Sequence, residues 1–268
     1  MSFSFKSRYG IEDLLEIMAL LRSPGGCPWD IEQDHLSIRE NLIEETYEVL
    51  DAIDSGDTEN LREELGDLLL QVVFHSRMEQ EAGSFDFNDV CHDICHKLII
   101  RHPHVFADVQ ADTPEEVLRN WNEIKQQTKG QKTATESMVS VPKGFPALMR
   151  AEKIQKKASR VGFDWTETEG AMEKLTEEIG ELREAIAAGE QSAIEDEFGD
   201  LLFAAVNVSR FVHVKPETAL AHACDKFVAR FSLVEQMAAQ RGIDMQSATL
   251  EQLDTLWDEA KLILVNAE

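Results

Sequence analysis

The feature that most constrains this chain of 268 residues is a pattern of paired carboxylates that occurs twice. The second copy reads Glu177-Glu178-x-x-Glu181 and then Glu197-x-x-Asp200. The first copy lies 133 positions earlier and consists of Glu44-Glu45-x-x-Glu48 and then Glu64-x-x-Asp67. The flanks also match, with EELGDLLL at 63–70 corresponding to DEFGDLLF at 196–203. A repeat of this length predicts two tandem domains with the same fold.

Each copy of the pattern predicts a helical hairpin. Acidic residues three positions apart share one face of a helix. In the second copy, Ala188-Gly189-Glu190 interrupts the pattern and lets two helices fold back antiparallel. Apolar residues recur at helical spacing on both sides of this break, at Leu175, Ile179, Leu182, Ile186, Phe198, Leu201, Leu202 and Ala205. They give each helix a stripe that faces a core.

The folded hairpin would bring four carboxylates to one level. Like charges at short range repel and resist ionisation, so an unfilled cluster is unfavourable. Carboxylate oxygens are ligands that Mg²⁺ and Mn²⁺ prefer. We therefore predict a Mg²⁺ site, in which Mn²⁺ can substitute, formed by Glu178, Glu181, Glu197 and Asp200. The alternative is an ordinary acidic helix surface, because 51 acidic residues make such pairs common, but the repetition favours a metal site.

Helical periodicity runs along most of the chain, and no stretch alternates at period two for long. The sequence therefore predicts an all-α fold of tandem duplicated helical-bundle domains. The periodicity is lost in a polar segment rich in glycine, proline, serine and threonine. We predict a first domain at 1–128, a linker at 129–145 and a second domain at 146–268. Each domain offers few helices and much apolar surface, which favours burial against a twin subunit in a homodimer.

The composition excludes several functions. A formal charge of −25 argues against a nucleic-acid partner, whose phosphates need clustered lysine and arginine. It does not exclude a phosphorylated small molecule, because metal ions can bridge carboxylates to phosphates. No apolar stretch has the length of a membrane span, and the first residues lack the apolar core of a signal peptide. Four cysteines are too few for a disulfide scaffold, so we expect a cytoplasmic protein without a membrane partner.

Paired cations occur at matching places in the two copies. Lys226 and Arg230 lie one helical turn apart, as do Lys97 and Arg101 in the first copy. Such pairs could hold phosphate oxygens, although exposed basic pairs are common on any helix. The run Cys91-His92-x-x-Cys95-His96 does not have the spacing of a zinc finger, and we expect its cysteines to be buried on a helix.

The surroundings of the two acidic patterns differ. Lys174, one turn before the second pattern, corresponds to Asn41, and Asn207 corresponds to Phe74. A basic run from Arg150 to Arg160 precedes only the second hairpin, where it would form a solvated basic face or a domain contact, or attract an anionic substrate. Each difference removes positive or polar character from the first copy. We therefore predict that the second domain carries most of the catalysis and the first serves dimerisation or regulation.

These motifs resemble the MazG family of nucleoside triphosphate pyrophosphohydrolases. Besides the duplicated carboxylates, the resemblance rests on GCPWD at 26–30, RHPHVFAD at 101–108, PALMRAEKIQKKASRVGFDW at 146–165 and EFGDLLFAAVNVSR at 197–210. It implies an all-α fold that pairs as a homodimer. It also implies Mg²⁺-dependent cleavage of nucleoside triphosphates to a monophosphate and pyrophosphate, with loose base specificity.

The resemblance further implies a role for each residue of the second copy. The magnesium ligands would be Glu178, Glu181, Glu197 and Asp200. Glu177 would orient the attacking water as the catalytic carboxylate. The substrate-binding residues would be Lys174, Lys226 and Arg230 at the triphosphate, Trp257 in the nucleotide pocket, and Glu177, Glu178 and Asp200 beside the metal.

Two other classes of protein could use an acidic helical bundle. A ferritin-like di-iron protein needs Glu-x-x-His pairs, whereas here the second member of every pair is Glu or Asp. A non-enzymatic metal-binding helical module for dimerisation or regulation would keep the acidic clusters without turnover. Release of pyrophosphate separates this module from the enzyme.

Overall fold

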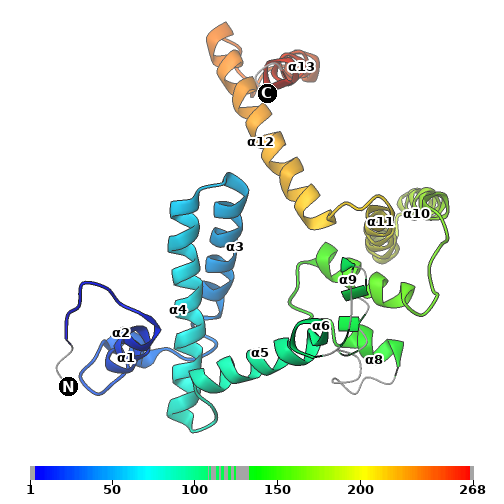
Figure 1. Cartoon of the computed structure of the whole chain (residues 1–268). Coiled ribbons are helices and arrows are strands. Elements are labelled where there is room, and N and C mark those ends of the chain that lie inside the picture. Colours follow the sequence, from blue (N-terminus) through cyan, green and yellow to red (C-terminus); the bar gives the residue numbers. More distant parts are fainter. Residues whose placement is uncertain are drawn as a thin grey trace. The chain divides into compact units, whose positions relative to one another are not determined.

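The structure, a computed structural model, describes residues 4–107, 109, 113–114, 116–117, 120–121, 124 and 133–265. It divides into two compact units, Met1–Lys129 and Gly130–Glu268, which we describe one at a time. Every regular element among the described residues is a helix, which confirms the predicted all-α fold (Figure 1). None of these helices combines the length and the apolar composition that a membrane crossing needs.

The first unit is organised around a long helical hairpin. Its described helices are α1 (Ile11–Leu21), α2 (Pro28–Glu32), α3 (Arg39–Ser55), α4 (Thr58–Ala82), α5 (Phe87–Arg101) and α6 (Pro103–Phe106). Helices α3 and α4 lie side by side, and α1 and α5 both pack against α4 (Figure 1). The core beneath α1 and α4 consists of Met18, Ile38, Val73, Phe74 and Met78.

The second unit repeats the hairpin. Its helices are α8 (Ala134–Val139), α9 (Ala147–Ser159), α10 (Thr168–Ala188), α11 (Gln191–Phe211), α12 (Pro216–Arg241) and α13 (Leu250–Val265). Helices α10 and α11 form the hairpin, and α9 packs against α11. The long helix α12 contacts α9 and pairs with α13 (Figure 1). A separate core joins α12 to α13 and consists of Val234, Met237, Ala238, Leu256 and Ala260.

The same turn chemistry closes both hairpins. Helix α3 ends at Gly56, whose φ is 69°, and α10 ends at Gly189, whose φ is 75°. These are left-handed conformations that glycine adopts without a steric penalty. Asp57 then caps α4 by accepting hydrogen bonds from two main-chain N–H groups of its first turn. The short connections keep each helix pair antiparallel, as the sequence predicts.

The segment predicted as the linker contains a helix. Helix α8 lies within 129–145, and residues 129–132 of that segment lie outside the described part of the chain. Thr133 and Glu136 form a capping box at its start, and α8 packs against α9. At least this part of the segment therefore belongs to the packing of the second unit.

Candidate active site

Three carboxylates of the second hairpin converge. Glu178 from α10 and Glu197 and Asp200 from α11 each offer an oxygen, and these oxygens all lie within 4.8 Å of one another. Glu178 is only 5 % exposed, and its Oε2 is buried without a hydrogen-bond partner among the described residues. A buried carboxylate oxygen without a partner is costly. A divalent cation would satisfy it, so the residues present fit a metal ion.

Glu181, the fourth expected ligand, lies at the border of this cluster. Its side chain is exposed, and it is not one of the three residues whose oxygens converge. Burial raises the pKa of Glu181 above its usual value, and a hydrogen bond and repulsion from Glu178 and repulsion from Glu197 add to this, while Lys174 opposes it. Glu181 is thus electrostatically coupled to the cluster, and its role as a ligand stays a prediction.

Lys174 sits at the rim of the cluster as expected. Its Nζ lies 2.8 Å from a carboxylate oxygen of Glu177 and 2.8 Å from one of Glu178. Hydrogen bonds to Glu177 and then to Glu178 raise the pKa of Lys174 well above its ordinary value. The lysine therefore stays charged and offsets part of the negative charge of α10. The Glu177 side chain is 56 % exposed, so solvent can reach it.

A pocket of about 840 Å³ adjoins the carboxylates. Lys174, Glu178 and Asp200 line it together with apolar and aromatic side chains, among them Ile154, Phe163, Trp165 and Phe203. Pockets of this size, mostly apolar with a few polar groups, are typical of small-molecule sites. The pocket therefore joins a candidate metal centre to walls on which a flat ring can stack.

Three polar residues of the pocket were not identified from the sequence. Arg210 forms an ion pair with Asp164, and its Nη1 donates to Asn207 Oδ1 at 2.6 Å. Gln155 donates from Nε2 to the main-chain carbonyl of Phe203 at 2.8 Å. Asp164, Arg210 and Gln155 all lie in the segments 146–165 and 197–210 that carry the family resemblance. That resemblance was the available signal, but it assigns no role to the individual residues.

The other expected substrate-binding residues lie on α12 and α13. The structure brings Arg230 and Trp257 together, with the guanidinium carbon 5.9 Å from the ring centroid. The Phe227 ring lies 5.0 Å from the same indole. Lys226 is exposed on α12. Neither Lys226, Arg230 nor Trp257 lines the pocket beside the acidic cluster, and their contact with substrate stays a prediction.

The basic run on α9 makes contacts inside the second unit. Lys156 and Lys215 both pair with Glu152, which is 8 % exposed. Lys157 donates to the Ser137 hydroxyl of α8 at 2.6 Å, and the Lys153 ammonium lies over the Phe145 ring. Part of the basic run is therefore used for packing and ion pairing within the second unit, and its contact with another domain and its attraction of substrate stay predictions.

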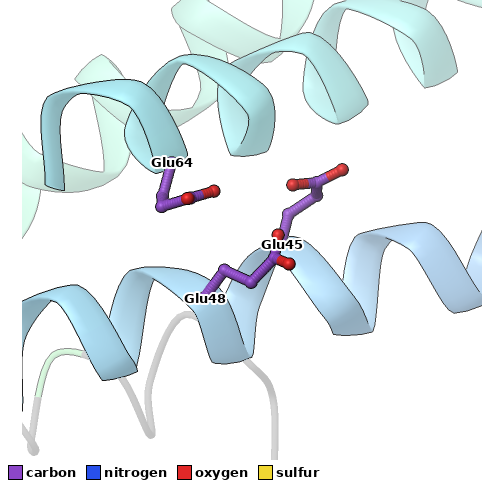
Figure 2. Close-up of side chains that lie close together, drawn as sticks. All are labelled: Glu45, Glu48 and Glu64. Carbon is purple, nitrogen blue, oxygen red and sulfur yellow. The ribbon is translucent and has the colours of Figure 1, made fainter. Parts of the chain in front are cut away.

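The first copy keeps an acidic cluster. Glu45 and Glu48 on α3 and Glu64 on α4 point toward one another, with oxygens within 4.8 Å, whereas Asp67 is not part of this group (Figure 2). Burial, followed by repulsion from Asp67 and Glu48, raises the pKa of Glu45 above its usual value. Repulsion between clustered carboxylates is therefore present in both units.

The side chains beside the acidic cluster of the first unit differ from those beside the cluster of the second unit. Gln71 stands where the second copy has Ala204, and Phe74 stands where it has Asn207. Phe74 is 4 % exposed in the core, with the Arg22 guanidinium 5.3 Å from its ring centroid. The Gln71 amide reaches Glu45 at 3.5 Å. Larger side chains thus occupy the positions that line the pocket in the second unit.

Comparison with known proteins gives the same assignment for both copies. The model of the MazG nucleotide pyrophosphohydrolase domain matches residues 33–106 and 166–235. The chain is 48 % identical over 256 residues to the nucleoside triphosphate pyrophosphohydrolase of Escherichia coli, covering 94 % of this chain and 97 % of the relative. It is 46 % identical over 250 residues to a Thermotoga maritima protein named nucleoside triphosphate pyrophosphohydrolase/pyrophosphatase MazG, covering 93 % and 95 %. The chain therefore belongs to the MazG family of nucleotide pyrophosphohydrolases, and the family predicted from the sequence is confirmed.

Proposed function

We propose that the second unit hydrolyses nucleoside triphosphates to a nucleoside monophosphate and pyrophosphate in the presence of Mg²⁺. The observation that carries the proposal is the pocket in which Glu178 and Asp200 share walls with aromatic side chains. The carboxylates would hold a metal ion that binds the triphosphate. The aromatic side chains would stack on the base. The names of the E. coli and T. maritima relatives support the reaction class.

The chain's own residues supply the remaining chemistry. Glu178, Glu197 and Asp200, with Glu181 at their border, would hold Mg²⁺, or Mn²⁺ in its place. An ion held by these residues would supply charge neutralisation for the phosphates and a lower pKa for a water molecule bound to it. Glu177 is exposed beside the cluster, where it can orient the attacking water and take up its proton. The water oxygen bonds to phosphorus as the phosphoanhydride bond breaks, so hydrolysis needs no covalent enzyme intermediate.

Lys174 would bind the triphosphate. In the structure its ammonium is shared between Glu177 and Glu178. With a cation at the carboxylates, Lys174 would be available to pair its ammonium with a phosphate oxygen. Lys226, Arg230 and Trp257 would complete the substrate site from a second subunit, because they do not line the pocket of their own unit.

The exposed apolar side chains support a homodimer. On the second hairpin they include Ile179, Ile186, Phe198 and Leu202, and on the first hairpin Ile43, Tyr47, Leu65 and Leu69. Burial of such surfaces against a twin subunit is favourable. Light scattering at micromolar concentration is expected to give twice the chain mass of 30.3 kDa. A mass equal to one chain would contradict the homodimer.

Loose base specificity belongs to the proposal, and its test is turnover of several substrates. We expect pyrophosphate release from ATP, GTP, CTP and UTP in the presence of Mg²⁺, measured with the purified protein at equal concentrations of each. A helical spectrum without turnover of any of the four would favour the non-enzymatic dimerisation or regulatory module. The cytoplasmic location and the lack of a nucleic-acid partner stay predictions of the sequence.

A further inference from the structure

The pocket of the second unit contains a hydrogen-bond acceptor for which the described residues supply no donor. Gln155 lines this pocket from α9 and is only 5 % exposed. Its Nε2 donates to the Phe203 carbonyl at 2.8 Å. Its Oε1 is shielded from water and has no hydrogen-bond partner among the described residues. Because a carbonyl oxygen cannot donate, the bond to Phe203 fixes which end of the amide is left as the acceptor.

A second amide of the pocket is also fixed. Asn207 is 8 % exposed, and its Oδ1 accepts from Arg210. Arg210 is in turn held by the carboxylate of Asp164 in the loop before α10. With Oδ1 occupied, the Nδ2 group of Asn207 is left as the donor end of this amide. The pocket therefore presents one oriented acceptor and one oriented donor. Gln155 is positioned by its bond to the Phe203 carbonyl of α11, and Asn207 by Arg210 of its own helix.

An unpaired buried acceptor is unfavourable in the free protein, and native structures keep such groups at few places, often functional ones. A ligand that enters this pocket with an N–H or O–H group would supply the missing donor. Phe163 and Trp165 line the same pocket and are both exposed, so a planar ring can stack beside the amides. A flat heterocycle with an N–H group on its edge meets both requirements.

We propose that Gln155 Oε1 accepts a hydrogen bond from an N–H on the Watson–Crick edge of the nucleobase, with Asn207 donating to the acceptor beside it. The inference rests on the proposed function. Adenine and cytosine offer an amino N–H on this edge, and guanine and uracil offer a ring N–H. One acceptor therefore admits all four natural bases and rejects only a base without such a donor. Gln155 is then a specificity-determining residue that is compatible with loose base specificity.

The test compares ATP with the triphosphate of purine riboside, which lacks the amino group and has no N–H on that edge. We expect kcat/KM of the unchanged protein to favour ATP by roughly tenfold, the worth of one hydrogen bond to a buried acceptor. Gln155→Met keeps the length of the side chain and removes the acceptor. It should abolish the preference, so that kcat/KM becomes equal for ATP and purine riboside triphosphate, even if the lost bond to Phe203 lowers both constants.

The analogue also separates recognition from damage to the fold. If Gln155 only ties α9 to α11 through Phe203, the substitution lowers both constants by the same factor, which would overturn the proposal. Equal constants in the unchanged protein would overturn it without any variant. Gln236→Met, on the exposed face of α12, is the matched control and should leave the ratio at its original value. Failure to release pyrophosphate from any triphosphate would refute the proposed function instead.

Discussion

Glu197→Ala is expected to reduce triphosphate hydrolysis to the background rate, whereas Glu64→Ala should leave most of it. Both substitutions remove one carboxylate from an acidic cluster whose oxygens lie within 4.8 Å of one another. In each case repulsion between carboxylates is relieved, so neither variant should unfold. At Glu197 a proposed metal ligand is also lost. The second cluster opens onto a pocket that Asn207 lines. In the first unit Phe74 occupies the position equivalent to Asn207 and lies in the core.

Glu64→Ala is the matched control for Glu197→Ala, because the two domains are repeats of one another. The two glutamates occupy the same position of the duplicated pattern, and the change in side chain is identical. Rates are to be measured at saturating Mg²⁺ with variants whose helical circular dichroism matches that of the unchanged protein. Equal losses in the two variants, or a loss confined to Glu64→Ala, would contradict the assignment of catalysis to the second unit.

Removal of divalent cations is expected to stop hydrolysis altogether. A nucleoside triphosphate carries about four negative charges and would have to approach three clustered carboxylates, which is strongly unfavourable without a counter-ion. Lys174 alone cannot offset this, because Glu177 and Glu178 already share its charge. We expect a fall of at least about a thousandfold in kcat/KM, the scale of several kcal/mol of lost charge stabilisation.

The measurement is the initial rate after treatment with excess chelator and gel filtration, followed by titration with Mg²⁺ or Mn²⁺. Both ions should restore the rate, since both prefer carboxylate oxygens. Asp200→Asn is the matched variant, because it keeps the size of the side chain and weakens one ligand. It should require a higher Mg²⁺ concentration for half-maximal rate. Full activity of the cation-free protein would rule out the metal-dependent reaction.

Much of the fold follows from local patterns in the sequence. The carboxylate pairs three residues apart, the apolar stripes and the glycine breaks each act within a few helical turns, and together they define both hairpins. Their repetition identifies two units. The segment that contains α8 was predicted to be a linker because it is polar. The spacing of Thr133 and Glu136 is that of a capping box and indicates the start of a helix there.

The pocket was less predictable than the acidic cluster. Gln155 reaches the carbonyl of Phe203, 48 positions away, and Arg210 reaches Asp164, 46 positions away. No periodic pattern records such contacts, because they depend on how α9 and the loop before α10 pack on α11. The spacing of Lys226 and Arg230 places both on one face of a helix, but it cannot show what that face meets. That depends on which elements distant in the sequence pack against it.

The most direct test of the account is the identity of the products of one nucleoside triphosphate. The purified full-length protein is incubated with ATP and Mg²⁺, and the nucleotides and phosphates are resolved by ion-exchange chromatography over a single time course. We expect AMP and pyrophosphate in equal amounts from the first time point, without ADP, and no products from Glu197→Ala. Accumulation of ADP with inorganic phosphate, or an unchanged product pattern from Glu197→Ala, would contradict the proposed reaction.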